Sequence, residues 1–126
     1  MKDYVQPGDR TILVVEDEYL IRMDLVIQLE ELGFRAVEAA TLFAAQNVVR
    51  DETLDAAILD VRLPDGEVFP VARQLCELEV PFLFHSAHVR GDDLPGCFDG
   101  VPIVPKPSSE TRFRAALRGL LPDAGV

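Results

Sequence analysis

Basic residues are scarce in this chain of 126 residues. It has 12 Lys and Arg against 22 Asp and Glu, a formal net charge of -10 at pH 7. No basic stripe of the kind that binds duplex nucleic acid is present. No apolar run approaches the ~20 residues of a membrane helix, and residues 1–10 lack the apolar stretch of a secretory signal. We therefore expect a cytoplasmic protein that binds neither nucleic acid nor membrane.

Cysteine is also rare. Cys76 and Cys97 stand alone, with no metal-type spacing around them, and we interpret them as reduced thiols rather than as a redox pair. The chain is 48% hydrophobic and 27% charged, which is ordinary for a globular protein. This length and composition predict one compact domain.

Short apolar runs alternate with helical patterns along the chain. Gly33 stands at the end of the first helical pattern, Thr41 is expected to cap the second helix, Pro70 lies in the first turn of the third, and Ser108 is expected to cap the last. The alternation predicts an α/β fold in which a doubly wound parallel sheet has helices on both faces. The five predicted strands cover residues 11–15, 34–39, 56–59, 81–86 and 101–104.

The segment between the fourth and fifth strands interrupts this rhythm. Residues 88–100 contain Gly91, Pro95, Gly96 and Gly100, so we expect the fourth helix to be short or degenerate. After Leu121 the sequence is typical of a frayed tail. We accordingly divide the chain into an N-terminal extension (1–10), a single domain (11–121) and a C-terminal tail (122–126).

Polar side chains follow the predicted strands at their carboxyl ends, where a doubly wound sheet forms its ligand crevice. These residues are Glu16 and Asp17, Asp60, Ser86 and Lys106. Taken singly, the acids could be solvated loop residues or an Asx turn, and Lys106 a surface residue between two prolines. Together they form a set of hard oxygen ligands suited to Mg²⁺, with a hydroxyl and an ammonium beside it.

This set has the parts needed to bind a phosphoryl group. A carboxylate such as Asp60 can form a covalent phosphoryl intermediate. Transfer requires that the charge on the phosphoryl oxygens be neutralised, which a metal ion, Lys106 and the Ser86 hydroxyl could share.

The sequence resembles the response-regulator receiver domains of two-component signalling, over about residues 11–121. In order and rough spacing, four motifs carry the likeness: VVEDE (Val14 to Glu18), ILDVRLPDG (Ile58 to Gly66), Phe84-His85-Ser86-Ala87 and VPKP (Val104 to Pro107). The resemblance implies a flavodoxin-like receiver fold with strand order 2-1-3-4-5, here as a stand-alone, single-domain receiver.

The resemblance also implies a role for each site residue. Asp60 would be phosphorylated, and Mg²⁺ (or Mn²⁺) would be held by Asp60, Glu16, Asp17 and the Arg62 backbone carbonyl. Ser86 matches the switch hydroxyl, and Lys106, with a cis bond to Pro107, matches the lysine that contacts the phosphoryl oxygens. The donor would be a sensor histidine kinase or a histidine phosphotransfer protein, so the chain is expected to be a phosphoacceptor rather than an enzyme.

Two features depart from the family pattern or add to it. Receivers usually have Tyr or Phe three residues before the lysine, but this chain has Ile103, whose branched side chain rotates less freely. His85 and His88 flank Ser86. They are either a pH-sensitive or metal-binding pair, or one buried or strand-facing histidine and one loop histidine. We also hypothesise that Arg62 and His88 tune the access of water to the acyl phosphate.

Three functions compete at this point. The first is a phosphoacceptor that signals through a protein partner or serves as a phosphate sink. The second is a phosphorylation-independent pseudo-receiver that acts as an interaction module, which Ile103 and the weak fourth helix favour. The third is a nucleotide- or flavin-binding enzyme. Acids stand after the first strand where a Gly-rich phosphate loop would have to lie, so the third is disfavoured.

Overall fold

The computed structural model describes residues 10–87 and 93–126. Five parallel strands form one sheet in the order β2-β1-β3-β6-β7, which is the predicted order 2-1-3-4-5 when only the sheet strands are numbered. The strands are β1 (Thr11–Val15), β2 (Arg35–Ala39), β3 (Ala56–Leu59), β6 (Phe82–Ser86) and β7 (Ile103–Pro105). The predicted fold class is therefore confirmed.

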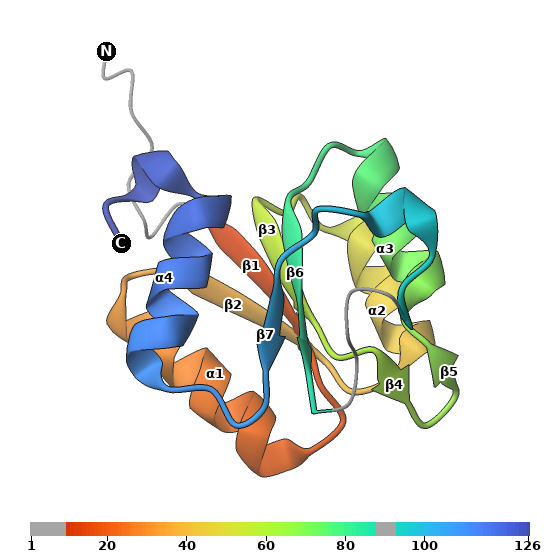
Figure 1. Cartoon of the computed structure of the whole chain (residues 1–126), viewed down its shortest axis with the longest axis horizontal. Coiled ribbons are helices and arrows are strands. Elements are labelled where there is room, and N and C mark those ends of the chain that lie inside the picture. The colour runs from red at the N-terminus through yellow and green to blue at the C-terminus, as the bar shows by residue number, and fades with distance from the viewer. Residues whose placement is uncertain (1–9, 88–92) are drawn as a thin grey trace.

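Helices cover both faces of this sheet, as Figure 1 shows, with α1 and α4 on one side and α2 and α3 on the other. Alternate residues of β1 supply the two cores: Leu13 and Val15 face α2 and α3, whereas Ile12 and Val14 face α1 and α4. All four side chains are at most 1% exposed, as expected of a central strand buried on both faces. The helices are α1 (Tyr19–Glu31), α2 (Leu42–Asp51), α3 (Phe69–Glu77) and α4 (Glu110–Leu120).

Most of the helix ends predicted from local sequence signals are confirmed. Thr41 caps α2 by accepting a hydrogen bond from the Ala44 amide at 3.1 Å, and Gly33 follows α1 with a φ of 90°. The predicted cap of the last helix was wrong by one residue. Ser109 caps α4 by accepting from the Arg112 amide, while the Ser108 hydroxyl is hydrogen-bonded to His85 instead.

Other expectations were less accurate. Leu78 continues the apolar spacing of Val71 and Leu75 but is 58% exposed, because α3 ends at Glu77 and the chain turns away there. Within the described part of the segment between β6 and β7, residues 93–102, the longest helical element is η3 (Gly96–Phe98), a three-residue 3₁₀ helix. This agrees with a degenerate fourth helix. The C-terminal residues include a 3₁₀ helix, η4 (Pro122–Ala124), and Ala124 packs into the core beside α4 rather than fraying.

A short hairpin follows β3. β4 (Arg62–Leu63) pairs in antiparallel fashion with β5 (Gly66–Glu67), joined by the two residues Pro64 and Asp65. The Val68 amide donates to the Val61 carbonyl at 2.9 Å and closes the base of the hairpin. This hairpin holds the chain immediately after Asp60 in a defined conformation.

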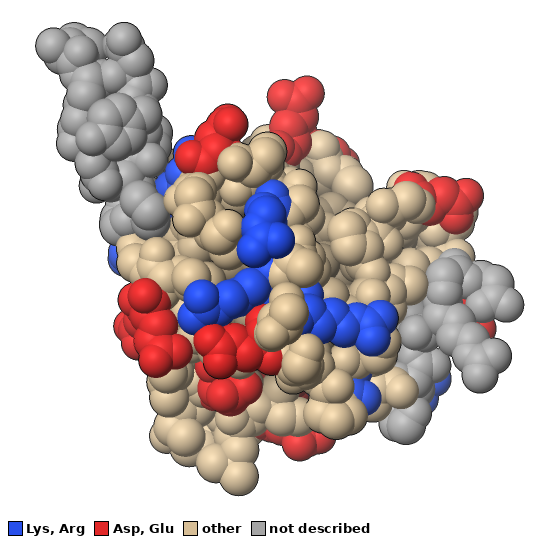
Figure 2. Space-filling view, turned by 60° about the vertical axis from the view of Figure 1, so that its left-hand side comes forward, with Lys and Arg blue, Asp and Glu red and all other residues tan. Residues whose placement is uncertain are grey.

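The outer surface carries both signs of charge. Figure 2 shows several Lys and Arg side chains gathered in the middle of one face, with acidic side chains beside them. Part of the positive charge on α4 is neutralised, since Arg114 pairs with Glu110 at 2.7 Å. Cys76 and Cys97 are both exposed and unpaired. Among the described residues, no helix has the length and apolar character needed to cross a membrane.

Candidate functional site

A cleft of about 220 Å³ lies at the carboxyl ends of β1, β3 and β6. Five of the six predicted site residues line this cleft. The sixth, Glu16, lies just beneath the cleft and is 1% exposed. The six side chains come from four segments of the chain, near residues 16–17, 60–62, 86 and 106, which the parallel sheet brings together. The residues that line the cleft are Asp17, Glu18, Asp60, Arg62, Ser86, Ala87 and Lys106.

Glu16 anchors the acidic loop after β1. One carboxylate oxygen lies 2.5 Å from the Lys106 ammonium, and the other accepts a hydrogen bond from the Glu18 amide at 3.1 Å. The backbone of Glu16 is fixed as well, because its amide donates to the Ala39 carbonyl and its carbonyl accepts from the Arg22 guanidinium at 2.7 Å. The loop that carries Asp17 is therefore held on both sides.

Asp60 follows β3 directly, and its amide donates to the Val15 carbonyl at 2.9 Å. Burial raises the pKa of its carboxyl group from 3.8 to about 7, with a further contribution from the nearby charge of Glu16 and an opposing one from Lys106. The raised pKa means that the carboxylate is ill solvated without a compensating positive charge. Perturbed acids of this kind are common at functional sites.

Lys106 joins the two acids. Its ammonium lies 2.5 Å from Glu16 and 3.3 Å from Asp60, and its side chain is 11% exposed. Burial by itself lowers the pKa of Lys106, but its contacts with Glu16 and Asp60 outweigh burial and raise that pKa above 10.5. The side chain therefore stays charged. The peptide bond from Lys106 to Pro107 is cis, as the family resemblance implied.

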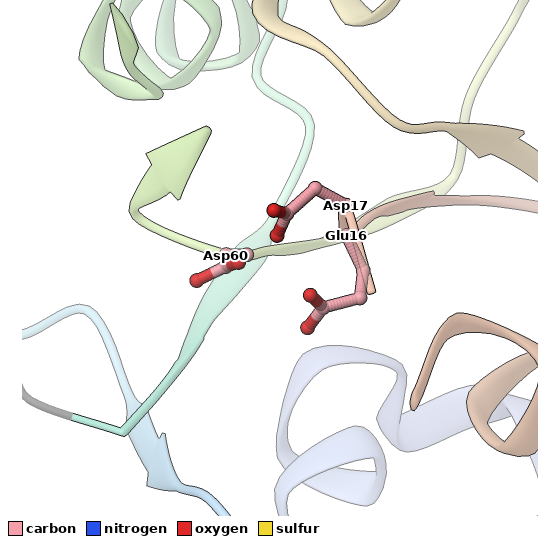
Figure 3. Close-up of side chains that lie close together, drawn as sticks. All are labelled: Glu16, Asp17 and Asp60. Carbon is pink, nitrogen blue, oxygen red and sulfur yellow. The ribbon is translucent and has the colours of Figure 1, made fainter. Parts of the chain in front are cut away.

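The three acids fit a divalent cation. One carboxylate oxygen each from Glu16, Asp17 and Asp60 lies within 4.8 Å of the other two, and Figure 3 shows the three carboxyl groups close together where β1 and β3 end. Hard oxygen ligands of this number and charge suit Mg²⁺, which keeps several waters and accepts phosphate oxygens. A cation here would offset the burial and the nearby charge of Glu16, which together raise the pKa of Asp60.

The remaining predicted residues lie on the rim of the cleft. Ser86 ends β6 and is 5% exposed, and Arg62 begins β4 on the other side. His85 points away from the cleft into the core between α1 and α4, where its ring nitrogen Nε2 lies 3.0 Å from the Ser108 hydroxyl. The interpretation of His85 as a buried histidine on a strand is confirmed. His88 lies outside the described residues.

A larger hollow of about 420 Å³ adjoins the cleft on the side of α1. It shares Glu18, Ala87 and Lys106 with the cleft but does not include Asp60. Its walls are mainly apolar, and Leu20 beside it is 71% exposed. The chemistry of the three acids belongs to the smaller, more polar cleft, so size alone does not identify the site.

Ile103 occupies the position where the family pattern has an aromatic ring. It is partly buried and packs against the core on the α2 and α3 side of the sheet, which also contains a cluster of four phenylalanines. Within the cluster Phe69 stacks on Phe98 at 5.7 Å between ring centroids, and Phe84 meets Phe98 edge to face at 5.8 Å. Nothing in the sequence indicates that Phe69 and Phe98 join Phe84 here. The members of the cluster are Phe69, Phe82, Phe84 and Phe98.

Two supporting residues were missed by the reading of the sequence. Arg22, on α1, joins the Glu16 carbonyl to the Glu38 carboxylate, at 2.7 and 3.0 Å. The carboxylate of Asp65 accepts hydrogen bonds from the Leu42 and Phe43 amides. Arg22 and Glu38 lie 16 residues apart, and Asp65 lies 23 and 22 residues from Leu42 and Phe43, so no local sequence pattern predicts these contacts.

The fold and the acidic cleft together define a class of signalling domain. The chain belongs to the response regulator receiver domain family, which it matches over residues 12–118, and hence to two-component signalling. The four receiver motifs found in the sequence therefore gave the right family.

Individual relatives agree with this assignment. The chain is 30% identical to the phosphate regulon transcriptional regulatory protein PhoB of Pseudomonas aeruginosa, over 92% of this chain and 53% of that protein. It is 36% identical to the transcriptional regulatory protein CreB of Escherichia coli, over 88% of this chain and 50% of that protein. The chain thus spans about half the length of these curated relatives.

Among solved structures, the chain is similar to the non-phosphorylated HemR receiver domain of Leptospira biflexa. The TM-score is 0.77 at 32% identity, and the match covers 88% of this chain and 93% of that one. The likeness therefore extends over most of this chain and most of that receiver domain.

Proposed function

We propose that Asp60 accepts a phosphoryl group from a phosphohistidine on a sensor histidine kinase or a histidine phosphotransfer protein. The observation that carries the proposal is the meeting of three acids with Lys106 in one cleft, the acids within 4.8 Å of one another and Lys106 paired to two of them. Such crowding of buried charge is costly unless a ligand uses it. A phosphoryl group and a divalent cation together match the cleft in charge and in ligand type.

Each residue has a part in this chemistry. An Asp60 carboxylate oxygen forms the new bond to phosphorus as the bond from phosphorus to the donor imidazole nitrogen breaks, and the imidazole takes up a proton. Lys106, already 3.3 Å from Asp60, would contact one phosphoryl oxygen, and the Ser86 hydroxyl on the rim would contact another. The ammonium stays charged because its pKa is raised, so it can offset the negative charge that arrives.

Glu16, Asp17, Asp60 and the backbone carbonyl of Arg62 would hold Mg²⁺, or Mn²⁺ in its place. When bound, the cation would supply positive charge against the phosphoryl oxygens. Asp17 is the exposed member of the three acids, and Glu16 is committed to Lys106 in the metal-free form. Asp17 is therefore the acid free to move toward an arriving cation.

Labelling by a small phosphodonor tests the proposal without knowledge of the kinase. Incubation with phosphoramidate and Mg²⁺, followed by mass spectrometry, should phosphorylate the wild type but not Asp60→Asn. Asp51→Asn is the matched control, since Asp51 is exposed and pairs only with Arg50 at the far end of α2. Equal labelling of Asp60→Asn and wild type, or a wild type unlabelled by phosphoramidate and by every kinase of its source, would reject the proposal.

We further propose that the phosphorylated receiver signals by binding a downstream protein or drains phosphoryl groups from a kinase. The alternative, an interaction module indifferent to phosphorylation, is favoured by Ile103 in place of an aromatic residue. Titration with Mg²⁺ and beryllium fluoride, followed by NMR, separates the two. A phosphoacceptor should show shifts that extend beyond the cleft to a surface, whereas an indifferent module should show none.

A further inference from the structure

Asp65 connects two parts of the molecule that the sequence does not relate. It lies at the tip of the β4–β5 hairpin, five residues after Asp60, and its carboxylate reaches the first turn of α2. One oxygen accepts a hydrogen bond from the Leu42 amide at 2.7 Å and the other from the Phe43 amide at 3.0 Å. The Asp65 side chain thus contacts residues that lie 23 and 22 positions earlier in the chain.

The contact completes the capping of α2. The first amides of a helix have no partner within the helix. The side chain of Thr41, the residue before the helix, accepts from the Ala44 amide, and Asp65 accepts from the two amides that precede it. These two hydrogen bonds lower the pKa of Asp65, so the carboxylate is charged at neutral pH and suits the positive end of the helix.

The rest of the hairpin lies close against α2 as well. Gly66 has a φ of +144°, and a Cβ built there would come within 3.2 Å of Leu42 Cδ2, closer than nearly all such contacts. Leu63 and Val68 are buried in the same core cluster that Leu42 packs against. The position of the hairpin is therefore set by α2 on one side and by the Asp60 amide, bonded to Val15, on the other.

We infer that Asp65 is a positioning residue for the cation site, acting by holding the β4–β5 hairpin, and with it the Arg62 carbonyl, in place beside Asp60. The inference rests on the proposed function, because Arg62 is assigned there to the cation. Arg62 lies two residues after Asp60 and lines the same cleft. A hairpin released from α2 could shift this carbonyl by enough to lose a ligand, since Mg²⁺ requires near-ideal octahedral geometry.

The test compares Mg²⁺ binding of three variants by isothermal titration calorimetry. Asp65→Ala should bind Mg²⁺ about tenfold more weakly than wild type, as is typical when a group that orients a metal ligand is removed. Asp65→Asn, which keeps one acceptor oxygen, should recover part of the loss. Thr41→Ala is the matched control: it removes a cap of the same helix end without touching the hairpin. Its affinity should stay within about twofold of wild type, because it moves no group that orients a ligand.

Two results would overturn the inference. One is Mg²⁺ affinity in Asp65→Ala equal to that of wild type. The other is an equal loss in Asp65→Ala and Thr41→Ala, which would mean that α2 stability alone is responsible. Unfolding of each variant in urea shows whether the protein is folded under the conditions of the titration.

Amide hydrogen exchange provides a readout that needs no metal. Asp65→Ala should exchange faster across residues 61–68, whereas Thr41→Ala should do so only in the first turn of α2. If the wild type fails to bind Mg²⁺, the proposed function is rejected. Amide hydrogen exchange alone then tests the role of Asp65. Unchanged exchange at residues 61–68 in Asp65→Ala then rejects the hairpin contact as a positioning device.

Discussion

Replacing Asp60 by Asn should stabilise the metal-free protein at pH 8. Burial, reinforced by Glu16 and opposed by Lys106, raises the pKa of Asp60 from 3.8 to about 7 in the folded protein. One pKa unit corresponds to about 1.4 kcal/mol, so the ionised carboxylate costs up to about 4 kcal/mol of folding free energy above pH 7. Asn removes this cost but also one of the two acids paired with Lys106, so we expect a net gain of about 1 to 2 kcal/mol.

The stability gained by Asp60→Asn should be smaller in acid. The pKa of Asp60 is higher in the folded protein than in the unfolded chain, so the folded state binds the proton more tightly. The stabilising contribution of the protonated group is complete below the unfolded-state pKa near 3.8 and is lost as the pH rises through about 7. At pH 5 the wild-type carboxyl group is mostly protonated, and the two proteins should differ far less.

Urea unfolding followed by circular dichroism, with EDTA present, measures the difference at both pH values. Asp51→Asn changes the same side chain at an exposed site and should show no such dependence between pH 5 and pH 8. Added Mg²⁺ should stabilise the wild type more than Asp60→Asn and narrow the gap. An Asp60→Asn protein no more stable than wild type at pH 8 would refute the claim that burial strains this carboxylate.

Two further predictions concern buried rings. His85→Gln should remove the loss of folding stability that protonation of His85 causes in acid. Burial, with the charge of Lys106, lowers the pKa of His85 to about 4 although Asp24 opposes it, so folding is weakened as the pH falls from 6.5 through about 4. Asp60 acts oppositely in that range, so the loss should be clearest in urea unfolding of the Asp60→Asn background. Phe98→Ala should cost about 3 kcal/mol in the same assay, because the ring is 1% exposed and stacked, whereas Phe43→Ala, 69% exposed, should change stability by less than about 0.5 kcal/mol.

The local signals in the sequence were strong wherever a residue acts on its own neighbours. Thr41 and Gly33 mark helix ends through contacts within a few residues, and the apolar runs mark buried strands directly. The error at Ser108 and Ser109 shows the limit of such signals. Either hydroxyl could cap α4, and the choice depends on the buried His85, which holds the Ser108 hydroxyl from a distant strand.

The motifs in the sequence were enough to assign the family, and the family resemblance implied the strand order. The residues that gather around Asp60 could also be predicted, because parallel strands put their carboxyl ends at one edge of the sheet. How those residues are paired depends on the tertiary structure. Lys106 bridges Glu16 and Asp60, Asp65 joins the hairpin to α2, and Phe69, Phe82, Phe84 and Phe98 pack against one another. These contacts join segments far apart in the chain, and their partners depend on distances of a few ångströms that no spacing along the sequence encodes.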